Sequence, residues 1–112
     1  MRTELARKTC TPCKGGVPPL SDSEIEKLLE ELDGWSVLEK NESHHLVKEL
    51  TFPDFIQALA AVNRIGSLAE EQGHHPDLHL AWGRVRVEIW THKINGLTES
   101  DFILAAKIDE VV

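Results

Sequence analysis

Apolar and polar residues alternate in two short runs, LHLAW at residues 78–82 and VRVEI at residues 85–89. Strict alternation is typical of a β-strand that has one face on a core and the other in solvent. The runs are separated by Gly83-Arg84, and a short break that contains glycine favours a tight turn. The sequence therefore predicts a hairpin in which residues 76–82 pair with residues 85–91.

A second hairpin is expected earlier in the chain, preceded by a helix. Strands at residues 35–39 and 46–52 flank the polar segment KNESHH, which is expected to form the turn between them. The helix is expected to begin at Ser21, because Glu24 completes a capping box with it. Gly34 is expected to end that helix with a left-handed cap.

Two further helices follow from apolar residues at helical spacing. The first covers residues 54–70, with Pro53 at its start and Gly73 beyond its end. The second begins at Thr98, where Asp101 occupies the third helical position and forms another capping box. As a helix cap, Asp101 is adequately explained without a catalytic role.

The resulting element order is α-β-β-α-β-β-α. Hairpins separated by helices favour an α+β domain with a four-stranded antiparallel sheet and three helices packed on one face. A chain of 112 residues suits one such domain, expected at residues 21–112. Residues 1–20 include paired glycines and paired prolines, which predict an extended or flexible N-terminal arm. The uncovered sheet face favours self-association.

Composition argues against several classes of partner and location. The net charge of −7 does not suit binding to a nucleic-acid backbone. No apolar run approaches the ~20 residues that span a bilayer, and the polar segment 1–8 lacks the apolar stretch of a secretory signal. A cytoplasmic location is therefore expected. Cys10 and Cys13 form a lone CxxC, for which chance metal binding or an inert tail is favoured over function.

Three of the six histidines are expected to converge at one end of the second hairpin. His74 and His75 lie between a helix end and a strand, and His92 follows the partner strand. A hairpin returns the end of its second strand beside the start of its first, which brings these imidazoles together. Imidazoles exchange protons near neutral pH, so a pair of them suits the elimination of water by general acid–base catalysis. The segment contains no obvious nucleophile.

Other interpretations of these residues remain open. A histidine pair before a proline is often a plain polar loop, and three histidines with Glu70 would also make an ordinary zinc shell, although no HExxH motif orders them. His79 is expected to be a surface or interface residue, because it alternates with apolar neighbours. His44 and His45 are expected to lie in a solvated turn.

The segment also resembles a known family, the pterin-4a-carbinolamine dehydratases, also called 4a-hydroxytetrahydrobiopterin dehydratases. The family pattern of spaced residues is met without a gap by Glu70, His74, His75, Pro76, Trp82, His92 and Asp101. The GLTESD stretch from Gly96 and the early Trp35 are also similar to the family. The resemblance extends from about residue 20 to the C-terminus.

The resemblance implies an enzyme that removes water from 4a-hydroxytetrahydropterin, a by-product of aromatic amino-acid hydroxylation, and yields quinonoid dihydropterin for tetrahydrobiopterin recycling. It implies no metal and no cofactor, and assembly as a homodimer or homotetramer. His74 and His92 would form the acid–base pair, while His75 would mainly hold the pterin and share the proton transfer.

The remaining site residues are assigned by the same resemblance. The substrate-binding set comprises His74, His75, Pro76, Thr91, His92, Lys93 and Ile94. Three residues are given supporting roles. Glu70 orients an imidazole or is a solvated carboxylate, Trp82 lines the pocket or simply packs, and Asp101 caps a helix. The alternatives to this enzyme are a non-enzymatic dimerisation or transcriptional cofactor that binds through a helix face, and a histidine-ligated metal hydrolase.

Overall fold

The computed structural model describes residues 5–8, 18–40 and 42–112. Within them the element order is the expected α-β-β-α-β-β-α, and the α+β fold is confirmed. The elements are α2 (Asp22–Leu29), β1 (Ser36–Lys40), β2 (Ser43–Thr51), α3 (Phe55–Gln72), β3 (Asp77–Ala81), β4 (Arg84–Ile89) and α4 (Glu99–Val111). None of these helices is long and apolar enough to cross a membrane.

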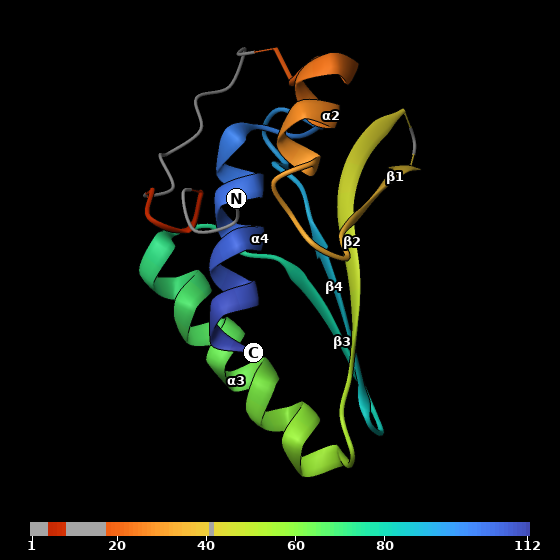
Figure 1. Ribbon diagram of the computed structural model, residues 1–112, viewed down its shortest axis with the longest axis vertical. Coiled ribbons are helices and arrows are strands. Elements are labelled where there is room, and N and C mark those ends of the chain that lie inside the picture. Colours follow the sequence, from red (N-terminus) through yellow and green to blue (C-terminus); the bar gives the residue numbers. More distant parts are fainter. Residues whose placement is uncertain (1–4, 9–17, 41) are drawn as a thin grey trace.

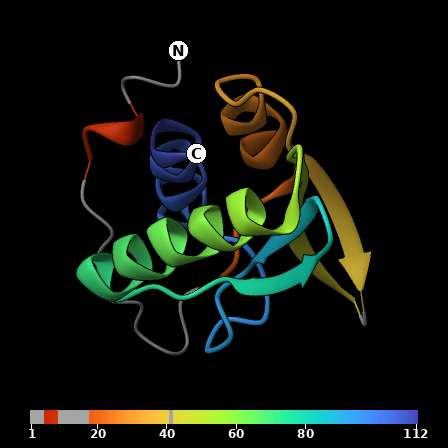
Figure 2. The same ribbon diagram turned by 90° about the horizontal axis from the view of Figure 1, so that it is seen from below.

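The strands form one antiparallel sheet in the order β1-β2-β4-β3, and all three helices lie on the same side of it (Figures 1 and 2). The two hairpins therefore meet through β2 and β4 at the centre of the sheet. The apolar members of the second alternating run, Val85, Val87 and Ile89, are fully buried on the helix side, and Leu78 and Leu80 of the first run are partly buried. Among the described residues, no helix lies on the opposite face of the sheet (Figures 1 and 2).

The β3–β4 turn lies one residue earlier than expected. Ala81 pairs with Arg84, so the turn residues are Trp82 and Gly83 rather than Gly83 and Arg84. Gly83 has φ of +67°, and a Cβ atom there would lie 2.9 Å from the carbonyl oxygen of Phe52. The β2–α3 connection therefore approaches the turn so closely that the second turn position must be glycine. The earlier turn shifts the strand pairing by two residues, so the same side chains still face the core.

The β1–β2 turn is also shorter than expected, and this corrects the placement of two histidines. β2 begins at Ser43, so His44 and His45 lie in the strand and not in a solvated turn. Glu42 has the positive φ of 64° that a tight hairpin turn uses. His45 is only 5% exposed.

The helix boundaries agree with the capping signals better than with the stop signals. Ser21 caps α2 with Glu24, as expected, but α2 ends at Leu29 and not at Gly34. Residues 30–32 continue in hydrogen-bonded turns, in which Leu32 is still buried, and residues 33–34 bend toward the first strand. Tight turns here bring the chain back to the sheet within a few residues.

The second helix starts one residue later and ends two residues later than expected. Asp54 is its N-cap and accepts a hydrogen bond from the Gln57 amide, so Pro53 precedes the cap. Gly73 provides the expected left-handed C-cap with φ of 66°.

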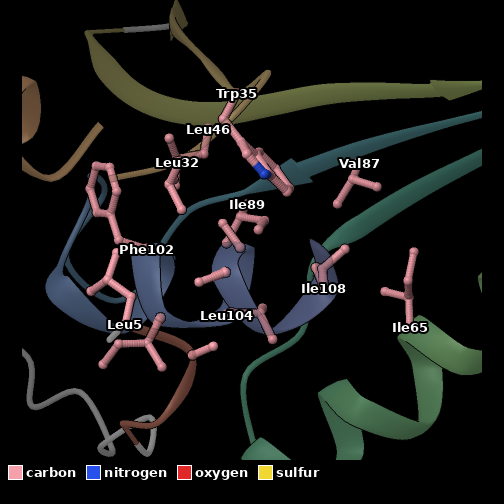
Figure 3. Close-up of a cluster of buried hydrophobic side chains, with 14 of the residues drawn as sticks. Leu5, Leu32, Trp35, Leu46, Ile65, Val87, Ile89, Phe102, Leu104 and Ile108 are labelled. Carbon is pink, nitrogen blue, oxygen red and sulfur yellow. The ribbon is translucent and has the colours of Figure 1, made fainter. Parts of the chain in front are cut away.

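The central element of the core is α4, whose residues from Ser100 to Ala106 are all buried. Phe102, Leu104 and Ile108 of this helix face apolar side chains of the strands and of α3 (Figure 3). Leu5 is also buried in this cluster, and Lys107 Nζ donates to the carbonyl oxygen of Ala6. Most of the expected N-terminal arm, with Cys10 and Cys13, lies outside the described residues.

Candidate active site

His74 is positioned by the end of α3. The left-handed turn at Gly73 directs the chain off the helix, and the His74 amide closes a hydrogen bond to Ala69. The Nε2 atom of His74 lies 2.5 Å from Oδ1 of Asp101, and the imidazole is only 13% exposed. The helix end therefore places this ring against the start of α4.

Asp101 uses both carboxylate oxygens and is fully buried. Its Oδ2 atom accepts hydrogen bonds of 2.8 Å from the Thr98 amide and from the Thr91 hydroxyl. The bond from Thr98 is the expected helix cap, and the N-terminus of a helix favours an anionic side chain. An ionised carboxylate only accepts hydrogen bonds, so Nε2 of His74 donates to it. Asp101 thus selects which ring nitrogen of His74 faces inward.

The segment after β4 is a compact turn that carries His92. Thr91 and Gly96 form an antiparallel bridge, and the amides of Ile94 and Asn95 donate to the Thr91 carbonyl. Asn95 adopts a positive φ of 56° within this turn. Thr91 is itself buried, and its hydroxyl donates a hydrogen bond to Asp101.

Two observations relate the turn at residues 92–95 to His74. Asp101 bridges His74 and Thr91, and Thr91 directly precedes His92. β3 and β4 also pair as far as Asp77 and Glu88, which lie three residues after His74 and three residues before Thr91. Both observations come from elements far apart in the sequence.

His75 points toward a different partner. Its Nε2 atom lies 2.5 Å from Oε2 of Glu70, five residues earlier in the last turn of α3. Both side chains are exposed, at 60% and 79%. The contact orients the imidazole while leaving it accessible, and because the pair is solvated it contributes little to stability.

His92 belongs to a stack of three rings that was not expected from the sequence. Its imidazole lies 4.2 Å from the Trp90 ring, and the other side of Trp90 stacks on His45 at 4.0 Å (centroid distances). His45 Nδ1 lies 2.5 Å from Oε2 of Glu88, and both residues of this pair are buried. The sequence does contain a signal for this stack, because Glu88, Trp90 and His92 alternate along the chain and so point to one face of it.

The environment of Glu88 favours its ionised form. Burial raises the pKa of this carboxyl, but the hydrogen bond with His45 and the nearby charges of Lys40 and Arg86 outweigh it and lower the pKa below the ordinary value. Lys40 Nζ and Arg86 Nη2 each approach the carboxylate to 4.0 Å. The carboxylate is therefore an acceptor for His45.

Two of the residues singled out in the sequence lie away from His74. Trp82 is in the β3–β4 turn, at the far end of β3, and is 73% exposed. His79 is exposed on the sheet face opposite the helices, where it lines a hollow with Lys40 and Arg86. In the described part of the chain, no group of three or more His, Cys, Asp or Glu side chains could hold a metal ion.

Residues 18–111 match the family model described as pterin 4 alpha carbinolamine dehydratase. The chain belongs to this family. Its members are dehydratases, a class of carbon–oxygen lyases, and a pterin fits as their substrate. The match covers the whole region from the Ser21 cap to the end of α4.

Relatives of the dehydratase family match almost end to end. A Rickettsia bellii protein is 61% identical over 106 residues, covering 94% of this chain and 91% of that protein. A Rubrobacter xylanophilus protein is 54% identical over 109 residues, covering 97% and 99%. Both names assign those proteins provisionally to pterin-4-alpha-carbinolamine dehydratase.

A solved structure supports the same dehydratase fold. The crystal structure described as a transcriptional coactivator/pterin dehydratase from Brucella melitensis has a TM-score of 0.75 and 32% identity. The match covers 83% of this chain and 97% of the Brucella chain. The α+β arrangement is therefore the fold of a pterin dehydratase.

Proposed function

We propose that this protein removes water from a 4a-hydroxytetrahydropterin by histidine general acid–base catalysis. The C4a–O bond breaks as the hydroxyl takes a proton, and N5 loses its proton as the C4a–N5 double bond forms. The products are water and quinonoid dihydropterin. In the cell, the reaction would return the cofactor of aromatic amino-acid hydroxylation to the tetrahydrobiopterin pool, in the cytoplasm.

The observation that carries this proposal is the anchoring of His74 by the buried Asp101. A carboxylate behind an imidazole fixes the ring and stabilises its protonated form. His74 and His92 act as the acid–base pair. The hydrogen bonds from His74 and Thr91 to Asp101 bring the segment that carries His92 close to His74, and the His92 ring itself stacks on Trp90.

The other binding roles belong to residues next to His74 and His92 in the chain. His75, oriented by Glu70, holds the pterin and shares in proton transfer. Pro76 and the turn backbone at Lys93 and Ile94 flank the ring. Thr91 supports the site from within, because its hydroxyl donates to Asp101.

The experiment follows dehydration of freshly generated 4a-hydroxytetrahydropterin with and without the protein. His74→Ala and His92→Ala should each slow the catalysed reaction by ~100- to 10,000-fold, the usual contribution of general acid–base catalysis. His79→Ala is the matched control, since that imidazole is exposed on the open sheet face, and it should leave the rate unchanged. Full activity in the His74→Ala/His92→Ala double variant would refute the mechanism.

A binding role is the second candidate, favoured by exposed apolar side chains on α3. Phe55, Ile56 and Leu59 are 41%, 71% and 37% exposed near the start of that helix. Such a face suits a second copy of the chain in a homodimer or homotetramer, or another protein. Ile56→Glu should abolish association and leave the fold intact. A monomeric Ile56→Glu variant with full dehydratase activity would separate the two roles.

A further inference from the structure

The stacked rings of His45, Trp90 and His92 connect β2 with the segment that follows β4. His45 lies in β2, Trp90 follows β4, and His92 lies two residues further along the chain. The rings of His45 and Trp90 are inclined by only 3°, and those of Trp90 and His92 by 12°. Trp90 is therefore held between two imidazoles, one buried and one exposed.

The buried end of the stack is fixed by charge and hydrogen bonding. His45 is 5% exposed and Glu88 is 4% exposed, and the His45 Nδ1 atom contacts the Glu88 carboxylate at 2.5 Å. β2 and β4 pair directly, with Leu46 opposite Ile89, so the backbones behind His45 and Trp90 are neighbours in the sheet. The His45 ring consequently has little freedom to turn.

The exposed end of the stack is different. His92 stands in the turn at residues 92–95, and its side chain is exposed. An exposed side chain samples several staggered rotamers unless a neighbour selects one. The contact described for the His92 ring is the face of Trp90.

We propose that His45, fixed by Glu88, is a positioning residue that sets the plane of the His92 imidazole through Trp90. His45 acts only through the tryptophan and touches no substrate. This inference rests on the proposed catalytic role of His92. Parallel aromatic rings attract one another in offset stacks, so the fixed ring orients the tryptophan and the tryptophan orients the exposed imidazole.

Two variants separate the stack from the buried charge. His45→Gln keeps a donor for Glu88 but removes the ring, so it should lower kcat about tenfold with little change in KM, within the losses that small misplacements of catalytic groups cause. The double variant His45→Phe/Glu88→Leu keeps a ring and removes the buried carboxylate, and it should restore most of kcat. His44→Gln is the matched control, because His44 faces Asp22 instead.

An NMR measurement accompanies the kinetics, because it tests the positioning role of His45 even if the protein has no dehydratase activity. The ring-proton resonances of His92, assigned by NMR, report the ring current of Trp90. They should move in His45→Gln, although residue 45 does not touch His92, and return toward wild type in His45→Phe/Glu88→Leu. A folded His45→Gln protein with wild-type kcat and unchanged His92 resonances would overturn the positioning role. Absence of dehydratase activity in the wild type would refute the proposed function alone.

Discussion

The imidazole of His74 and the carboxylate of Asp101 are in direct contact, 2.5 Å apart, although 27 positions separate them in the sequence. The contact exists because α3 ends where α4 begins. The same carboxylate caps α4 through the Thr98 amide. The Asp101 side chain therefore both caps α4 and holds the candidate catalytic imidazole of His74.

Asp101→Asn tests that link. The amide can still accept the Thr98 hydrogen bond, but its NH₂ group facing His74 would donate where the carboxylate accepts, and would favour the wrong tautomer. We expect kcat to fall by about 100-fold, at the lower end of a general acid–base contribution. Glu99→Gln, at the same helix terminus but paired with Lys8, is the control. Wild-type kinetics in Asp101→Asn would show that His74 does not need the carboxylate.

Glu88 gives the protein an acid-sensitive contribution to stability. Its pKa in the folded state lies below the ordinary value of 4.5, so the stabilisation is complete above that value and is lost as the pH falls through the folded pKa. Glu88→Gln should therefore flatten the acid side of the plot of unfolding free energy against pH. Denaturant titrations from pH 7 to pH 3 measure this. The control Glu49→Gln, exposed on the same sheet face, should keep the wild-type slope.

Asp109 supports the opposite end of α4. It accepts hydrogen bonds from Trp35 Nε1 at 3.0 Å and from Lys48 Nζ at 2.8 Å, and its side chain is 3% exposed. Asp109→Ala leaves a buried indole N–H and a largely buried ammonium group without this acceptor, and should cost about 2–3 kcal/mol of unfolding free energy.

The activity of the folded Asp109→Ala protein provides the second measurement. Asp109 lies eight residues beyond Asp101 on the same helix, roughly 12 Å along its axis. Below the unfolding temperature, kcat should therefore match the wild type. If the folded Asp109→Ala protein instead has a lower kcat than the wild type, the two ends of α4 are coupled.

The sequence predicted the elements that depend on local chemistry. Ser21 and Thr98 mark the helix starts because capping is decided within four residues, and alternation predicted which faces of the strands are buried. The positions of turns were harder to predict. The break at Gly83 was misplaced by one residue because the contact that requires glycine comes from Phe52, about thirty residues earlier.

The same limit explains the missed ring stack. The turn between β1 and β2 was expected to extend through His45, so this residue was placed in solvent. Its burial depends on Glu88 and Trp90 in a strand about forty residues away, and no local pattern reports that pairing. For His74, in contrast, the spacing of the motif was informative, because the helix end and the helix cap that hold it are both local signals.

Two glycines provide an opposed pair of stability predictions. Gly83→Ala places a methyl group 2.9 Å from the Phe52 carbonyl oxygen at a φ of +67°, so both the contact and the backbone oppose it. We expect a loss of more than about 1 kcal/mol. Gly66→Ala lies inside α3, where nothing lies within 4 Å of the added carbon, and should instead gain about 0.5–1 kcal/mol from helix propensity. Thermal unfolding of both variants checks the signs, and a stabilised Gly83→Ala protein would mean that Gly83 does not adopt a positive φ beside Phe52 in the β3–β4 turn.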